Sequence, residues 1–268
     1  TVRLDPNHVA LGLSIQLGDR YDDLRNLAHI DEWKRAPLLI SNFSLEQDSV
    51  IVGNGLGGSL YLNVPEEYPD GPISVEVEGA IRQGVFSQGT TGAVEFAEAL
   101  EGGAPLAILE NPGKVRMVVL ADALREVQDL DAVLDFWTGF YDSHRTLSGE
   151  PNPRKYESHW SFDPHVGWGY ANATPHRINF PQLATGWALR TQTGDEDWWL
   201  FAHELGHQFQ TPDWSGGDVT EVCVNLFSLY TLNFYLNDGG DRETVGHRVG
   251  PVDHAALEAS RWGSADLF

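Results

Sequence analysis

The sequence predicts an α+β fold in which a β-rich N-terminal lobe precedes a helical C-terminal lobe. Short runs in the first half carry apolar residues at every second position and are separated by turns rich in glycine and proline. The second half carries apolar residues at helical spacing. With 268 residues, we expect one domain, β-rich over about 1–150 and helical over about 151–268.

Four runs carry the strand signal. Alternating or continuous apolar residues predict strands at 50–52, 59–64, 73–78 and 115–120. The first three are bounded by glycines at 53–58 and by the Pro-Asp-Gly-Pro turn that ends at Pro72. These strands account for the β-rich first lobe.

Helical spacing begins at about residue 129. Apolar side chains recur every three or four residues over 129–147, and Gly149 follows this run. A polar, aromatic stretch, rich in Pro, Gly and Asn, occupies 151–190. Further helices are predicted from after Asp195 to about Gln210, over about 218–237, and near 253–262, with a loop over 238–252.

Charge and composition exclude several functional classes. Lys and Arg number 17 against 39 Asp and Glu, so the net charge is −22. This balance opposes binding to nucleic acid or to an anionic membrane, because both require a basic surface. No uninterrupted apolar run reaches the roughly 18 residues of a membrane span. Since Cys223 is the single cysteine, neither an internal disulfide nor a four-thiolate zinc site is possible.

The chain begins at Thr1 and lacks an initiating Met. Its first residues have neither the basic segment nor the apolar segment of a signal peptide. We therefore expect a mature or excised fragment of a larger protein.

The helix near residue 200 contains a His-Glu-x-x-His motif. His203 and His207 are four residues apart, so both imidazoles project from one helix face and can bind a single zinc ion. Glu204 is placed to accept a proton from the water that the metal activates. The same helix is rich in Trp and Phe, which favours burial, and burying these polar groups without partners would be unfavourable by roughly several kcal/mol.

A catalytic zinc ion needs a third protein ligand, and two positions offer one. Asp213 follows His207 by six residues, but Gln210 replaces the glycine that would turn the chain there. Glu221 lies on the next predicted helix, after a loop long enough to fold that helix back antiparallel. Asn225 lies one turn further along the same face, where it can fix the tautomer of a ligand histidine. The pairing favours Glu221 as the ligand.

These residues resemble the enhancin-like zinc metallopeptidase family. Residues 203–210 are similar to the family pattern His-Glu-x-Gly-His-x-x-Gln, and 221–230 resemble its Glu-Val-x-Val-Asn-x-x-Ser helix. Upstream, 57–62 resemble the family's Gly-Gly-hydrophobic-Tyr strand, and 167–170 resemble its Gly-Tyr turn. The resemblance implies a zincin-type metallopeptidase fold of the gluzincin class with one zinc ion.

The resemblance also implies a secreted or cell-surface endopeptidase that cuts mucin-like, O-glycosylated proteins. Aromatic side chains that stack on sugar rings would suit such a substrate, and Trp168, Trp187 and Trp214 are candidates beside Tyr170. For the group that stabilises the oxyanion of the tetrahedral intermediate we favour Tyr170, with His165 and His176 as rivals.

Two other classes of function stay open. One is a catalytically inactive module on the same fold that binds glycan or protein, although the intact Glu204 argues against it. The other is a different zinc hydrolase: a general peptidase without glycan dependence, or an aminopeptidase, for which no Gly-x-Met-x-Asn segment is present. The sequence leaves the preferred glycan and the oligomeric state open.

Overall fold

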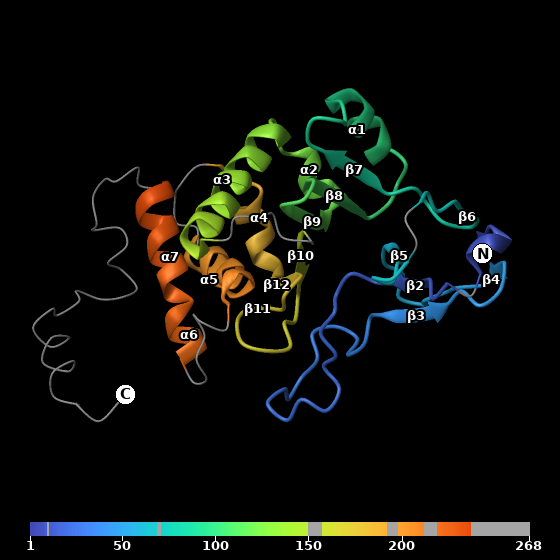
Figure 1. Ribbon diagram of the computed structural model, residues 1–268, viewed down its shortest axis with the longest axis horizontal. Coiled ribbons are helices and arrows are strands. Elements are labelled where there is room, and N and C mark those ends of the chain that lie inside the picture. Colours follow the sequence, from blue (N-terminus) through green and yellow to red (C-terminus); the bar gives the residue numbers. More distant parts are fainter. Residues whose placement is uncertain (10, 69–70, 150–156, 192–197, 212–218, 237–268) are drawn as a thin grey trace, which may run out of the picture.

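The computed structural model describes residues 1–9, 11–68, 71–149, 157–191, 198–211 and 219–236. Two regions can be distinguished by their hydrophobic cores: an N-terminal region that ends with strand β6 (Val75–Val77), and a main region that begins with strand β7 (Gly84–Ser87). Figure 1 shows the N-terminal sheets at one end of the molecule and a larger sheet in the middle. The helices α3 (Leu130–Ser148), α5 (Trp198–Phe209) and α7 (Asn225–Tyr230) lie toward the other end.

The N-terminal region consists of two three-stranded antiparallel sheets, ordered β4-β1-β6 and β3-β2-β5. Alternate side chains of the central strands, including Val2, Leu4, Ile15 and Leu17, form its core. The predicted strands 50–52, 59–64 and 73–78 correspond to shorter ones here. The elements are β1 (Val2–Leu4), η1 (Pro6–His8), β2 (Ser14–Leu17), β3 (Ser41–Ser44), β4 (Ser49–Val50), β5 (Leu60–Asn63) and β6 (Val75–Val77).

The main region is built on a six-stranded mixed sheet with the order β11-β12-β10-β9-β8-β7. The pairs β12/β10, β10/β9 and β8/β7 are parallel, and the pairs β11/β12 and β9/β8 are antiparallel. The strand predicted at 115–120 is confirmed. The strands are β7 (Gly84–Ser87), β8 (Leu106–Asn111), β9 (Val115–Leu120), β10 (Ser158–Asp163), β11 (Asn172–Ala173) and β12 (Arg177–Pro181).

Strands β10 and β12 lie within 151–190, where the sequence indicated only a polar, aromatic stretch. Trp160 and Phe180 enter the core of the main region. On the opposite face of the same sheet, His159 meets aromatic rings and Asp163 forms an ion pair, both with the N-terminal region. Since polar side chains are buried on that face too, the stretch lacks the run of apolar residues typical of a central strand. Because β10 and β12 follow α3 along the chain, this helix lies between strands of the same sheet in the sequence.

Helices cover the other face of this sheet. The longest, α3, confirms the predicted 129–147 helix: the Asp129 side chain caps its first turn, and Gly149, at φ 72°, ends it in the left-handed conformation. In the main region, the described helices that precede residue 198 are α1 (Ala93–Leu100), α2 (Ala121–Arg125), α3 (Leu130–Ser148), η2 (Gln182–Ala184) and α4 (Thr185–Ala188).

The helix with the His-Glu-x-x-His motif is α5 (Trp198–Phe209). The helix predicted over 218–237 takes the form of three successive segments, α6 (Thr220–Cys223), α7 (Asn225–Tyr230) and the π-helical η4 (Thr231–Leu236). The predicted loop 238–252 and helix 253–262 lie outside the described residues. Within the described part of the chain, no helix is both long enough and apolar enough to cross a membrane.

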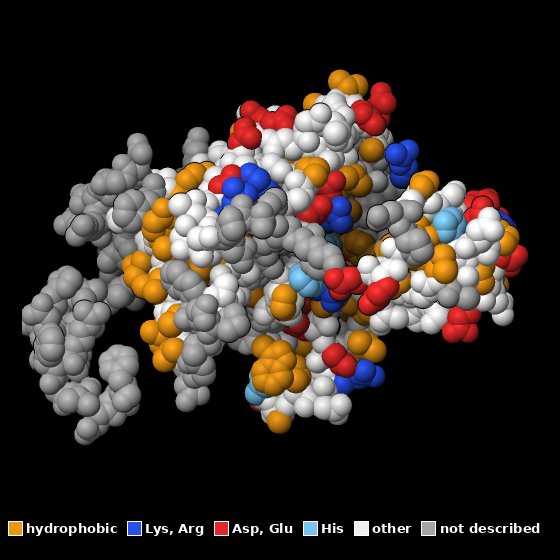
Figure 2. Space-filling model, viewed as in Figure 1, with side chains coloured by type: hydrophobic (Ala, Val, Ile, Leu, Met, Phe, Trp, Pro, Cys, Tyr) orange, Lys and Arg blue, Asp and Glu red, His pale blue; other side chains and the backbone are white. Residues whose placement is uncertain are grey.

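Figure 2 shows Asp and Glu side chains at several places on the visible face, with Lys and Arg side chains in separate small groups. Among the described residues visible on this face, the basic side chains form no continuous patch of the kind that nucleic acid requires.

Candidate metal centre

The structure brings His203, His207 and Glu221 together at one point between α5 and α6. The two Nε2 atoms are 3.2 Å apart, and Glu221 Oε2 lies 3.1 Å from that of His203 and 3.5 Å from that of His207. Three ligands of a tetrahedral zinc ion at about 2.0–2.2 Å would lie roughly 3.3–3.6 Å apart. The residues present therefore fit a small divalent cation with nitrogen and oxygen ligands.

Gly206 explains how α5 and the following helix come so close. A Cβ atom at this position would lie 2.8 Å from Val224 Cγ2 and 2.9 Å from Phe227 Cβ, both of which are shorter than real Cβ contacts. The absence of a side chain lets α7 pack directly on α5. Because α6 precedes α7 without a break in the chain, this packing also fixes Glu221 over the two histidines.

Two amide side chains hold the outer nitrogens of the histidines. Asn225 Oδ1 lies 3.0 Å from Nδ1 of His203, and Gln210 Oε1 lies 2.9 Å from Nδ1 of His207. An amide oxygen only accepts, so each Nδ1 donates and each Nε2 lone pair is left for a metal ion. Burial lowers the pKa of His207, which also favours the neutral ring that a metal requires.

The two amides are themselves fixed by backbone carbonyls. Asn225 Nδ2 donates to the Glu221 carbonyl at 3.0 Å, and Gln210 Nε2 donates to the Thr220 carbonyl at 2.8 Å. Sequence reasoning gave Asn225 its role but assigned none to Gln210. The available signal was the Gln that ends the family pattern.

Glu204 lies beside this group with a side chain that is almost fully buried, since the residue is only 6% exposed. Burial, and then the nearby carboxylate of Glu221, raise the pKa of Glu204 to about 8. A cation bound by the two histidines and Glu221 would lower this pKa again. Glu204 is thus placed to hold or release a proton near neutral pH.

A cavity of about 700 Å³ opens over these residues. The opposite wall comes from the loop before β11 and the turn after it, and it includes Trp168 and Tyr170, which are 59% and 53% exposed. Gln208 ties this wall to α5 by donating to the Thr174 carbonyl at 3.0 Å. An open cleft with exposed aromatic rings suits a large polar ligand better than one small side chain.

The other residues considered from the sequence lie elsewhere. Trp187 packs against the hydrophobic core instead of the cleft. His165 accepts a hydrogen bond from the Lys34 amide on its Nδ1 at 3.1 Å, and neither His165 nor His176 lines the cavity. Trp214 and Asp213 lie outside the described residues.

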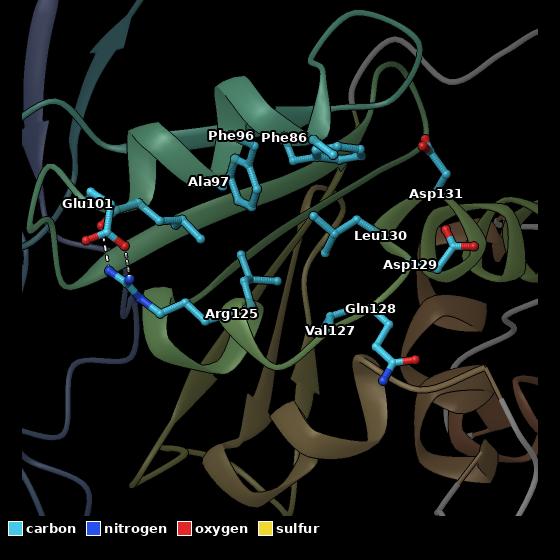
Figure 3. Close-up of a pocket in the computed structure, with 13 residues that line it drawn as sticks. Phe86, Phe96, Ala97, Glu101, Arg125, Val127, Gln128, Asp129, Leu130 and Asp131 are labelled. Carbon is cyan, nitrogen blue, oxygen red and sulfur yellow. Dashed lines mark hydrogen bonds and ion pairs between the residues drawn. The ribbon is translucent and has the colours of Figure 1, made fainter.

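Another cavity, of about 430 Å³, lies between α1 and the segment that joins α2 to α3 (Figure 3). Phe86, Phe96 and Leu130 contribute apolar walls, and an ion pair between Glu101 and Arg125 closes one end at 2.5 Å. None of the predicted site residues lines it. The cleft over α5 is therefore the candidate site.

Comparison with known proteins decides the family. Residues 79–257 match the sequence model described as "Peptidase M60, enhancin and enhancin-like", and residues 1–78 match the N-terminal domain of M60-like peptidases. The chain belongs to the M60 peptidase family. Membership implies a metal ion, and among the described residues the group of His203, His207 and Glu221 is positioned to hold one.

Solved structures of M60 domains share this fold. The M60 catalytic domain of ZmpC from Clostridium perfringens, in complex with the sialyl T antigen, is 16% identical with a TM-score of 0.62. The similarity covers 87% of this chain and 49% of that chain. IMPa from Pseudomonas aeruginosa, in complex with an O-glycopeptide, is 17% identical with a TM-score of 0.62, covering 90% of this chain and 31% of that one.

The curated relatives of this M60 chain have a different description. TRPM8 channel-associated factor 3 from Rattus norvegicus is 24% identical over 84% of this chain, and a homolog from Xenopus laevis is 28% identical over 82%. The match spans about a quarter of each relative, 24% in both cases.

Proposed function

We propose that this chain is a zinc-dependent endopeptidase that hydrolyses peptide bonds in mucin-like, O-glycosylated proteins. The observation that carries the proposal is the convergence of His203, His207 and Glu221 within 3.1–3.5 Å, beside a buried Glu204, at the base of an open cleft. Titratable side chains that converge in a cleft, one of them a buried carboxylate with a raised pKa, mark a candidate catalytic site.

In this proposal His203, His207 and Glu221 hold the zinc ion. When bound, the ion would lower the pKa of a water molecule and polarise the scissile carbonyl. Glu204 accepts the proton of the attacking water and transfers it to the leaving amine. Tyr170, on the opposite wall of the cleft, donates its hydroxyl to the oxyanion. Asn225 and Gln210 keep the imidazoles in the tautomer that presents Nε2 to the ion.

The substrate class is inferred from the cleft and from the structural relatives. A peptidase for O-glycosylated chains must admit a bulky sugar next to the scissile bond, and the exposed Trp168 and Tyr170 give this cleft stacking surfaces. The ZmpC and IMPa structures were solved with a glycan antigen and an O-glycopeptide. A mucin-like substrate would be met outside the cell, so we place the protein as secreted or on the cell surface.

A second candidate is a binding module on the same fold. It is favoured by the curated relatives, whose names describe channel-associated factors. The complete set of ligand residues with Glu204 favours the enzyme, because a module that only binds has no use for a buried carboxylate next to a metal site.

The two candidates are separated by a cleavage assay with purified, zinc-loaded protein. A Ser/Thr-rich O-glycoprotein should be cut next to its glycosylated residues, and a chelator or Glu204→Gln should stop the reaction. The Gln variant keeps zinc but loses roughly 100- to 10,000-fold in turnover, because only proton transfer is removed. Equal rates on glycosylated and deglycosylated substrate would indicate a general zinc peptidase without glycan dependence. Binding of the substrate without cleavage would support the binding module instead.

A further inference from the structure

The connection between β2 and β3, residues 18–40, is unusually long for two adjacent antiparallel strands, which are commonly joined by about 2–5 residues. It belongs to the N-terminal region in sequence, but Figure 1 shows it (blue) leaving that region's sheet and running next to the loop that precedes β11 (yellow). Long ordered connections of this kind often serve a site. Its contacts show which site it serves.

Arg35 fixes this connection on the six-stranded sheet. Its Nε and Nη2 atoms donate to the two carboxylate oxygens of Asp163 at 2.7 and 2.8 Å, and both side chains are buried, 6% and 0% exposed. Nη2 also donates to the Asp22 carbonyl at 2.9 Å. The bidentate pair therefore places Asp22 at a defined point over the main region.

One carboxylate oxygen of Asp22 gathers three donors from the main region. Its Oδ2 accepts from the Gly167 amide at 2.6 Å, from Asn172 Nδ2 at 2.9 Å and from Asn179 Nδ2 at 2.8 Å. Gly167 and Asn172 bracket the loop that carries the two exposed aromatic rings of the cleft. A Cβ atom at Gly167 would lie 3.0 Å from Asp22 Cβ, so the glycine permits this close approach.

His29, further along the same connection, also contacts the start of this loop. Its Nε2 lies 2.8 Å from the Gly167 carbonyl, so an Nε2–H donates to it. The His29 ring also packs on the Trp168 ring, with centroids 4.8 Å apart and planes at 44°. Both polar groups of Gly167 are thus bound by residues about 140 positions earlier in the chain.

We propose that the β2–β3 connection supports one wall of the substrate cleft, with Asp22 and His29 as positioning residues that hold the loop of Trp168 and Tyr170 in its binding geometry. Through this loop the N-terminal region then determines the affinity for O-glycosylated substrate, whereas His203, His207 and Glu221 all come from the main region. This inference rests on the proposed function for its substrate and on the contacts above for its geometry. Holding the wall in place before binding raises affinity, because less conformational entropy is lost on binding.

The test uses the full chain, zinc-loaded, with Glu204→Gln so that an O-glycopeptide binds without being cut. Into this background go Asp22→Ala, His29→Ala and the control Asp23→Ala, since the Asp23 carboxylate pairs with Arg25 in the same connection. Calorimetry measures glycopeptide affinity, and hydrogen–deuterium exchange measures protection of 164–175. Zinc content is measured for each variant.

We expect Asp22→Ala and His29→Ala to weaken binding by about 10-fold and to speed exchange over 167–172, because the wall must be ordered on binding. Zinc content stays at the level of the background protein, and Asp23→Ala binds within about twofold of it. Asp22→Asn should recover most of the affinity, because its amide keeps an accepting oxygen. In the active enzyme, KM rises and kcat falls as well, because the loosened loop also carries Tyr170.

Normal affinity and normal exchange in Asp22→Ala and His29→Ala would overturn the inference. So would loss of zinc in parallel with loss of binding, since both residues would then support the fold as a whole. If Asp22→Ala does not fold, the affinity and exchange measured for His29→Ala decide whether the inference holds. Failure of the Glu204→Gln background itself to bind any glycopeptide would count against the proposed substrate, while the exchange data would still test the positioning of the wall.

Discussion

Gln210 reaches back one turn of α5 to bind Nδ1 of His207 at 2.9 Å, and its amide nitrogen reaches forward to the Thr220 carbonyl at 2.8 Å. One side chain thereby connects a predicted metal ligand to the segment that carries the next one. Asn225 does the same for His203 from the other side. This set of hydrogen bonds holds the candidate metal centre together by connecting α5 and the residue that follows it to α6 and α7.

Replacing either amide should loosen this set. We expect Gln210→Ala and Asn225→Ala each to lower zinc affinity or activity by roughly 10- to 100-fold, in line with other groups that orient histidine ligands. Competition with a chromophoric chelator measures the affinity. Unchanged zinc affinity and activity in both variants would show that the histidine tautomers are set by other contacts.

Removing the carboxylate of Glu221 should empty the site. The wild-type chain is expected to hold about one zinc ion, and Glu221→Ala should lose most of it, since a site with three protein ligands weakens sharply when one is removed. Metal analysis after dialysis gives the stoichiometry. Asp213→Ala is the matched control and should retain the ion. If Asp213→Ala loses the ion and Glu221→Ala keeps it, Asp213 and not Glu221 is the third ligand.

Gly206→Ala should separate α5 from α7. The added Cβ would meet Val224 and Phe227 at 2.8–2.9 Å, so the helices must move apart. We expect a loss of about 1–3 kcal/mol in the free energy of unfolding and weaker zinc binding, because Glu221 moves with its helix. Chemical denaturation measures the first and zinc titration the second. Gly186→Ala is a suitable control, because nothing lies within 4 Å of a Cβ there.

Acid should destabilise the fold through His144, which is fully buried between α3 and α5. Burial lowers the pKa of His144 from its ordinary 6.5 to about 4, so the ring stays neutral in the folded chain while the unfolded chain binds a proton near pH 6.5. The stability that depends on the neutral ring is complete above pH 6.5 and is lost progressively down to pH 4, by at most about 3 kcal/mol.

His144→Gln removes this titration. Urea unfolding at pH 7, 6 and 5 should show a shallower dependence of stability on pH in the variant than in the wild type. Because Nε2 of His144 lies 2.9 Å from the Ala202 carbonyl, directly before the first histidine of the motif, the variant should also be less stable at pH 7. Parallel pH curves for the two proteins would contradict the role given to His144.

The sequence predicts features whose residues lie close together along the chain, and it misses those that depend on contacts between distant segments. His203 and His207 share a helix face by local geometry, and Glu221 with Asn225 repeats that argument one helix later. Strands β10 and β12 escaped prediction because the side chains on their second face are polar, although the N-terminal region buries several of them. Asp22 left no signal, since nothing local in the sequence links it to the Gly167 amide 145 residues later.

The buried ion pair between Arg35 and Asp163 has a consequence for how the chain folds. The two partners come from the segments matched by the two different family models, and each would be left as an uncompensated charge if the other segment unfolded. Leaving one charge of a buried pair alone is unfavourable by about 3–5 kcal/mol. The two segments that meet at residue 78 should therefore not unfold independently. Calorimetry should show a single cooperative transition for both. A chain that starts at residue 79 should be hard to obtain in folded form.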